Sequence, residues 1–287
     1  MNPVRTRSIV LAVIAAIVAA ACATMERTTV DGSPANATRL TGKFIWHDLL
    51  TDDVELATRF YSELLGWEFE RSSRLGRPYY LARLNGQYVA GVVPVQAREP
   101  QRRVAQWIGY VSVPSVEQAA RRVEAGGGSI ARGPRDVGEV GRAAIVRDLA
   151  GAPFGLATAA TGDPPDTAEP ASGQFFWMEY LARDVAAALD FYGSVVGYRA
   201  DASAGSSTYY LLETDRDRAG LYANPVPNAA PVWLPYISVE DPAAVAARVP
   251  QLGGRVLLEP ASGTRNGSFA IVADPSGAVV ALQRYPM

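Results

Sequence analysis

Residues 44–67 and 175–198 carry nearly the same order of apolar, aromatic and polar positions. Residues 44–50 are aromatic and branched with a period of two, which predicts a strand. Apolar residues after it recur at helical spacing, so a helix is expected to follow the strand directly. Because the pattern occurs twice at one constant spacing along the chain, we expect the protein to contain two copies of one fold unit.

The helix in each copy has clear start and stop signals. Asp53 is placed to accept a hydrogen bond from a backbone N–H at the helix start, and Gly66 can take the left-handed conformation that ends a helix. Asp184 and Gly197 occupy the same places in the second copy. One face of the preceding strand is expected to carry Phe44, Trp46, Asp48 and Leu50.

Short strands separated by turn signals fill the rest of each copy. Residues 79–84 and 87–93 flank Asn85-Gly86, a dipeptide that favours the positive φ angles of a tight hairpin. In the first copy further strands are expected at residues 107–113, 129–131, 143–147 and 153–158. The second copy repeats these signals with a shorter hairpin region.

A finer repeat lies inside each copy. Trp46, Trp107, Trp177 and Trp233 each stand seven residues before the start region of a helix, at Asp53, Pro114, Asp184 and Glu240 respectively. Ser115 can cap the helix after Trp107, and the glycines at 126–128 can stop it. The chain is therefore expected to fold as four tandem modules, each a strand, a helix and three strands.

The composition is that of an ordinary globular protein. The 287 residues are 48% hydrophobic and leave room for about two domains, which we place at residues 42–158 and 173–287. Residues 159–172 between them are small, acidic and rich in proline, as in a linker. The net charge of −2, without a clustered Lys/Arg face, argues against a nucleic-acid partner.

The first 22 residues have the build of an export signal. Arg5 and Arg7 precede an apolar run that is too short for a permanent membrane span, and the run ends at Cys22, the single cysteine. The small residues before Cys22 resemble a bacterial lipoprotein processing site, so we expect Cys22 to be lipidated and to anchor the protein to a membrane. A plain secretory signal cut near Ala21 and an uncleaved anchor are the alternatives. Residues 23–41 are polar and are expected to form a flexible tether.

Four such modules, with Phe-Tyr in the first helix of each copy and Asp-x-x-Gly-Ala before the last strand, resemble the vicinal oxygen chelate superfamily. This group contains glyoxalase I, the bleomycin-resistance proteins and the extradiol dioxygenases. The resemblance covers residue 42 to the C-terminus. It implies an α+β fold of four tandem βαβββ modules that form two glyoxalase-like domains, with curved mixed sheets around clefts.

The resemblance also implies where a metal would bind. In metal-using members, His or Glu on each first strand and Glu near the end of each module hold the metal. By position these places carry Trp46, Trp107, Trp177 and Trp233, with Gly155 and Ala281 at the module ends. Because none of these side chains ligates a metal, we expect no metal cofactor. The four tryptophans either fill the clefts or line a pocket for a flat ligand.

Asp48 and Glu179 are repeat partners, two residues past Trp46 and Trp177, and are expected on the cleft face. A carboxylate in an aromatic pocket could act as a general base or bind a cation, or it could be neutralised by a neighbour such as Arg142. Tyr110 and Tyr236 are matched and either reach the cleft or pack in the core. His47 is the only histidine, and its repeat partner is Met178, which favours a packed structural role.

Three functional hypotheses follow. The first is an exported, lipid-anchored and metal-independent protein that binds a small, partly aromatic molecule in a Trp-lined cleft. The second is an enzyme: a glyoxalase-like lyase or dioxygenase, or a metal-free isomerase or hydrolase with Asp48 or Glu179 as base. The third is a cell-envelope interaction protein with a filled cleft. The sequence leaves a homodimer open.

Overall fold

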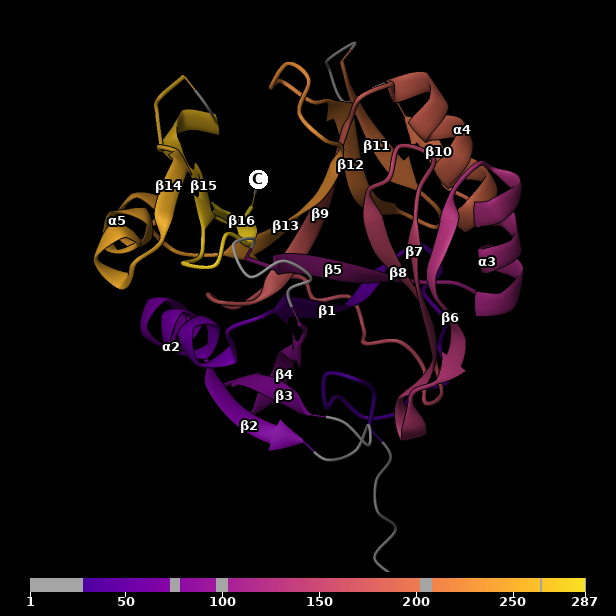
Figure 1. Cartoon of the computed structure of the whole chain (residues 1–287), viewed down its shortest axis with the longest axis horizontal. Helices are drawn as coiled ribbons and strands as arrows, with labels where there is room; N and C mark the ends of the chain where they lie inside the picture. Colours follow the sequence, from indigo (N-terminus) through magenta and orange to yellow (C-terminus); the bar gives the residue numbers. More distant parts are fainter. Residues whose placement is uncertain (1–27, 73–77, 97–102, 202–207, 264, 287) are drawn as a thin grey trace, which may run out of the picture.

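The computed structural model describes residues 28–72, 78–96, 103–201, 208–263 and 265–286 (Figure 1). The expected signal segment, including Cys22, lies outside these residues. Among the residues that are described, no helix is both long and apolar enough to cross a lipid bilayer.

The first domain is one curved mixed sheet with the strand order β2-β3-β4-β1-β5-β8-β7-β6. The central strands β1 and β5 are antiparallel to each other, β1 is parallel to β4, and β5 is parallel to β8. The strands are β1 (Phe44–Thr51), β2 (Glu68–Ser72), β3 (Tyr79–Leu84), β4 (Gln87–Pro94), β5 (Ala105–Ser112), β6 (Ser129–Asp136), β7 (Gly141–Arg147) and β8 (Pro153–Ala159).

The second domain repeats this topology in the order β10-β11-β12-β9-β13-β16-β15-β14. Neither sheet closes on itself, and the expected α+β fold of two glyoxalase-like domains is confirmed. The strands are β9 (Phe175–Ala182), β10 (Arg199–Asp201), β11 (Tyr209–Glu213), β12 (Asp217–Ala223), β13 (Val232–Ser238), β14 (Arg255–Leu258), β15 (Phe269–Ala273) and β16 (Val279–Gln283).

One helix follows the first strand of each module, and each begins with a capping side chain. Asp53 caps α2 (Val54–Leu65), Ser115 caps α3 (Val116–Ala125), Asp184 caps α4 (Val185–Val196) and Asp241 caps α5 (Pro242–Arg248). Gly66 and Gly197 end α2 and α4 in the left-handed conformation, as the sequence predicts. The hairpin between β3 and β4 also has the expected positive φ angles, 51° at Asn85 and 82° at Gly86.

The two domains share their cores. Figure 1 shows α3 beside α4 on one side of the molecule and α2 beside α5 on the other. Val116 and Val123 of α3 belong to the same buried cluster as Phe191 and Tyr192 of α4. A second cluster joins the α2 module to the α5 module. The convex face of each sheet is therefore buried against the other domain, and the two concave faces point apart.

Residues 28–41 lie against the first domain, although the sequence predicts a flexible tether here. The backbone N–H of Tyr88 donates to Asp31 O at 3.0 Å, and Leu40 N donates to the carboxylate of Asp163 at 2.6 Å. Asp163 belongs to the linker and is fully buried, where it also accepts a hydrogen bond from Ser112. Residues 28–41 and Asp163 of the linker are thus packed on the first domain.

Candidate ligand-binding cleft

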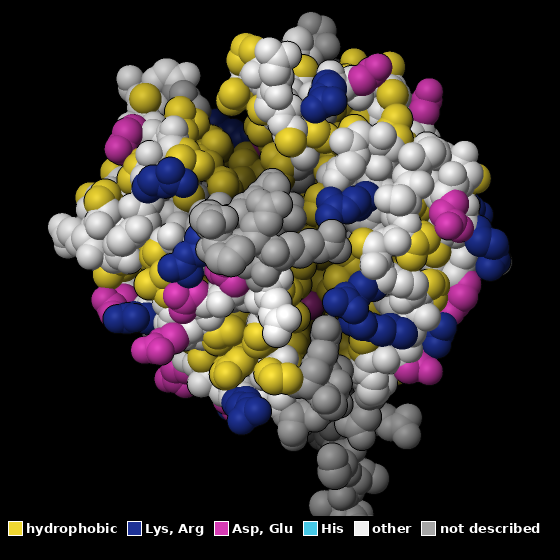
Figure 2. Space-filling model, viewed as in Figure 1, with side chains coloured by type: hydrophobic (Ala, Val, Ile, Leu, Met, Phe, Trp, Pro, Cys, Tyr) yellow, Lys and Arg dark blue, Asp and Glu magenta, His cyan; other side chains and the backbone are white. Residues whose placement is uncertain are grey.

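The concave face of the first sheet encloses a cleft of about 570 Å³. We call it the first cleft. Aliphatic side chains such as Ile45, Leu81 and Ile145 line it, and residues 28–30 border one side. Figure 2 shows the surface hollowed in this region, with hydrophobic side chains on the walls and Lys or Arg side chains along one edge. Its volume is in the range of sites that hold small organic ligands.

Four polar or aromatic side chains meet at the bottom of the first cleft: Asp48, Trp46, Tyr79 and Tyr110. We call them the floor cluster. The Tyr79 hydroxyl donates to Asp48 Oδ1 at 2.7 Å, and the Tyr110 hydroxyl donates to Oδ2 at 3.0 Å. The indole Nε1 of Trp46 lies 2.9 Å from both Asp48 Oδ1 and the Tyr79 oxygen. Burial, and after it the Asp48 charge, raises the pKa of Tyr79, so the tyrosine remains a donor at neutral pH.

Strand register explains why these side chains meet. Trp46 and Asp48 are two residues apart on β1 and share a face, and Trp46 lies opposite Tyr110 on β5. Gly91 on β4 lies beside Asp48. A Cβ at Gly91 would lie 1.9 Å from the Tyr79 hydroxyl and 2.4 Å from Asp48 Oδ1. The glycine therefore leaves the space in which the tyrosine reaches the carboxylate.

The second domain contains the same cluster on its concave face, the second cleft. Glu179 replaces Asp48 and is 0% exposed. It accepts hydrogen bonds from Tyr209, at 2.9 Å, and from Tyr236, and Trp177 donates to the Tyr209 hydroxyl at 3.4 Å. Gly220 leaves room for the Tyr209 hydroxyl just as Gly91 does for Tyr79.

The second cleft differs from the first by an arginine above its carboxylate. Arg265 Nη2 lies 2.7 Å from Glu179 Oε1. The guanidinium also lies over the rings of Tyr236 and Phe269, with centroid distances of 5.4 and 5.0 Å. Burial, and after it the Glu179 charge, raises the pKa of Tyr236. The Glu179 site is thus filled by a cation from the chain itself.

The structure corrects the expected placement of two tryptophans. Trp107 and Trp233 are 4% and 3% exposed and belong to the shared cores, where they donate to the hydroxyls of Tyr61 and Tyr192 at 2.9 and 2.8 Å. The repeat spacing places the starts of the following helices at Pro114 and Glu240. The capping residues are Ser115 and Asp241, one residue later in each case. A shift of one residue moves a strand side chain to the other face. The places that match Trp46 and Trp177 hold Ile108 and Leu234.

Phe44 also faces away from the cleft, although the alternation predicts it beside Trp46. A bulge in β1 between Phe44 and Trp46 shifts the register against β5. The Phe44 ring therefore packs on Trp233 of the other domain, with a centroid distance of 4.9 Å. Ile45 takes its place as a cleft residue.

Arg142 and His47 have structural partners. Arg142 borders the first cleft, but its guanidinium binds Glu117 of α3 at 2.6 Å and Asp136 at 2.8 Å. The sequence offers Arg142 as a partner that could neutralise Asp48, and the structure does not place it in that role. His47 is packed between the domains with its ring stacked on Phe175 at 4.1 Å, in line with the structural role that the sequence favours.

The described residues of the two clefts do not fit a metal ion. On the cleft face, Asp48 is surrounded by Trp46 on its own strand and by Gly91, Ile108 and Gly155 on β4, β5 and β8. None of these four side chains supplies an oxygen, imidazole or thiolate ligand. In the second cleft the matching residues are Trp177, Leu234, Gly220 and Ala281. Across the described ranges, no three His, Cys, Asp or Glu side chains are grouped so that they could hold a metal ion.

The sequence interpretation missed Tyr79, Tyr209 and Arg265. A signal for the two tyrosines exists, because Tyr-Tyr-Leu begins the same hairpin strand in both copies, at residues 79–81 and 209–211. Arg265 has no counterpart in the first copy. It lies in a short turn between β14 and β15, so only the folded chain brings it to Glu179.

Comparison with known sequences supports the duplication. The family model described as the Glyoxalase/Bleomycin resistance protein/Dioxygenase superfamily matches residues 43–156 and 174–282. CFP32 of Mycobacterium bovis, which its name provisionally describes as a glyoxylase, is 33% identical over 239 residues, or 82% of this chain and 91% of that protein. The anthracycline biosynthesis protein DnrV of Streptomyces peucetius is 31% identical over 255 residues, or 81% and 90% of the two chains.

Solved structures agree on the fold. The Mn(II)-bound glyoxalase from Novosphingobium aromaticivorans is similar with a TM-score of 0.58 and 16% identity, over 86% of this chain and 83% of that chain. The 2,2',3-trihydroxybiphenyl 1,2-dioxygenase of Sphingomonas wittichii has a TM-score of 0.56 at 16% identity, over 85% and 91%. The family match covers both copies of the unit, and the chain therefore belongs to the Glyoxalase/Bleomycin resistance protein/Dioxygenase superfamily.

Proposed function

We propose that the protein binds a small, partly aromatic molecule in the first cleft, without a metal. The observation that carries this proposal is the cleft of about 570 Å³ above Trp46 and Asp48. The half-buried indole of Trp46 offers a flat apolar surface, and the aliphatic walls favour an apolar ligand body. Two relatives are named for the biosynthesis of anthracyclines, which are flat fused-ring compounds, and this supports an aromatic ligand.

Binding has better support than chemistry at Asp48. Tyr79, Tyr110 and Trp46 all donate towards the carboxylate, so both of its oxygens already accept hydrogen bonds from the protein. A carboxylate held in this way has little room to take a proton from a ligand. The donors instead make a rigid polar floor that can orient a ligand.

The export signal leads to a further part of the proposal, that a lipid on Cys22 anchors the protein. Because residues 28–41 pack on the first domain, the chain between Cys22 and Thr28 can span at most about 20 Å. The lipidated protein would therefore hold the first domain close to the membrane. Membrane fractionation of the wild type and of Cys22→Ser tests this, and equal retention of both in the membrane fraction would refute it.

Fluorescence titration tests the ligand proposal. A panel of hydroxylated anthraquinones is titrated into the full-length protein, and Trp46→Phe is compared with Trp177→Phe, its repeat partner in the second cleft. We expect saturable quenching that Trp46→Phe weakens and Trp177→Phe preserves, unchanged by a chelator. Equal weakening in both variants would contradict binding in the first cleft, and loss of binding with the chelator would contradict metal independence.

A further inference from the structure

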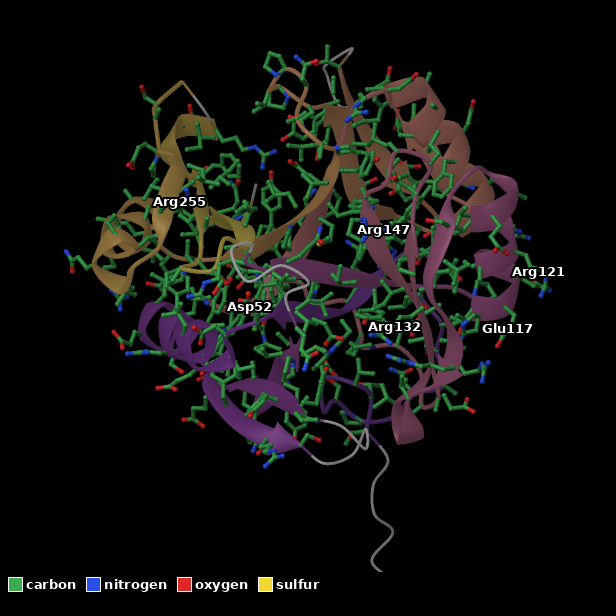
Figure 3. The ribbon with its side chains drawn as sticks, in the orientation of Figure 1. Asp52, Glu117, Arg121, Arg132, Arg147 and Arg255 are labelled. Atoms are coloured by element: carbon green, nitrogen blue, oxygen red, sulfur yellow. The ribbon has the colours of Figure 1, made fainter. Side chains whose placement is uncertain are left out.

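We propose that the ligand of the first cleft carries an anionic oxygen group, and that Arg132 and Arg135 of β6 bind it. We call these two residues the arginine wall. This inference rests on the proposed binding function and specifies the chemistry of the ligand. Both side chains line the first cleft. Figure 3 shows Arg132 on the inner side of its strand, with Glu117 and Arg121 of α3 on the outer side of the molecule.

A bulge in β6 directs both arginines to the same face. Arg132 lies opposite Ile145 of β7, and Arg135 lies opposite Ala143. The step from Arg132 to Arg135 is three residues, whereas the step on β7 is two, so β6 contains an extra residue. Without it, side chains three residues apart would point to opposite faces. Both arginines line the cleft together with their partners Ile145 and Ala143, as this shared face requires.

The second copy lacks this arrangement. Its β14 shares the first register shift of β6, with Leu258 opposite Ile271 where β6 has Arg132 opposite Ile145. The position that matches Arg135 is Ala261, beyond the end of β14. The arginine wall is therefore a property of the first cleft and not of the repeated fold.

Protection of a sheet edge would be another reason to place charges on β6, because exposed edge strands often carry charges and bulges. The matching edge strand argues against this reason. Leu257 and Leu258 of β14 are 51% and 37% exposed, so the same fold tolerates an uncharged edge at this place.

Charges around the wall favour an anion. Arg132 makes no hydrogen bond or ion pair with any residue that the structure describes. The nearby carboxylates of Glu117 and Asp136 are both bound by Arg142. At the cleft floor, Asp48 accepts hydrogen bonds from the tyrosines and Trp46. The ligand is thus expected to place its anionic oxygen group at the arginine wall and its apolar rings over Trp46.

Two closely matched probes test this inference: anthraquinone-2-carboxylate and the neutral anthraquinone-2-carboxamide. Their dissociation constants are measured by calorimetry for the full-length protein, Arg132→Gln and Arg255→Gln. Arg255 lies on β14 and serves as the control. We expect the wild type to bind the acid about tenfold more tightly than the amide, as charge-assisted hydrogen bonds predict. Arg132→Gln should remove this preference and leave amide binding unchanged, and Arg255→Gln should preserve it.

The outcomes separate this inference from the proposed function. Equal affinity of the wild type for acid and amide would overturn the arginine wall but leave the aromatic cleft in place. A preference for the acid that persists in Arg132→Gln would overturn it as well. Failure of both probes to bind would overturn the proposed function together with the inference. Weaker acid binding at high salt, with amide binding unaffected, would support it.

Discussion

His47 should make the protein sensitive to acid. Its side chain is 6% exposed between the two domains, and its ring stacks on Phe175 of the second domain. No described residue pairs with the ring nitrogen Nε2. Burial lowers the pKa of His47 from 6.5 to about 3, so the folded protein holds the neutral imidazole throughout the mildly acidic range.

The effect on stability has a definite sign and size. Because the pKa of His47 is lower in the folded state, the unfolded chain binds an extra proton between about pH 6.5 and pH 3. The free energy of unfolding therefore falls as the pH falls, by about 1.4 kcal/mol per pH unit within this window. Between pH 7 and pH 4.5 the loss is about 2–3 kcal/mol, a large part of a typical stability of 5–15 kcal/mol.

Replacing His47 with methionine isolates this contribution. The second copy carries Met178 at the matching position, packed against Gly109, so methionine suits this interface. Urea unfolding of the wild type and of His47→Met is followed at pH 8 and at pH 4.5. We expect the difference in unfolding free energy between them to shift by about 2–3 kcal/mol in favour of the variant at pH 4.5. Parallel loss of stability in both proteins would refute the assignment of a buried neutral histidine.

Three other substitutions test the cleft, the core and the N-terminal segment. In Gly91→Ala the new Cβ would lie 1.9 Å from the Tyr79 hydroxyl, so the hydroxyl must move, and we expect the free energy of unfolding in urea to fall by about 1–3 kcal/mol. Gly133→Ala is the control, because no atom lies within 4 Å of its Cβ, and its unfolding free energy should fall by less than about 0.5 kcal/mol. Trp107→Ala should lower the unfolding free energy by about 3–5 kcal/mol, and a loss below 1 kcal/mol would contradict its burial in the shared core. Asp163→Ala should make residues 28–41 more sensitive to limited proteolysis, and an unchanged cleavage pattern would show that other contacts hold this segment.

The sequence predicts local structure well where a cap and a repeat agree. Asp53, Gly66 and the Asn85-Gly86 turn each specify a backbone conformation through their own side chain or its absence, and the structure confirms them. The α+β fold is also predictable, because the same signals recur in both copies. These features depend on neighbours within a few residues, so a single sequence contains the information.

The strand faces are harder to predict. Pro114 and Ser115 are adjacent candidates for the start of α3, and choosing the wrong one places Trp107 in the cleft when it lies in the core. The contacts of the floor cluster join residues far apart in the chain, such as Asp48 and Tyr79. Bulges set the strand register and the glycine on β4 leaves space for the contact, and the hydrophobic pattern reveals neither.

The two copies share one cluster of side chains on the cleft face but differ in the arginine placed near it. Both keep a carboxylate among tyrosines and a tryptophan, which shows that the cluster itself suits the fold. In the second copy Arg265 neutralises the buried Glu179, and removal of that partner would leave an uncompensated charge costing about 3–5 kcal/mol. The first copy instead places Arg132 on a wall of an open cleft, without a described partner. One domain thus uses an arginine to neutralise its own buried carboxylate, whereas the other leaves an arginine on the cleft wall for a ligand, which agrees with the assignment of binding to the first cleft.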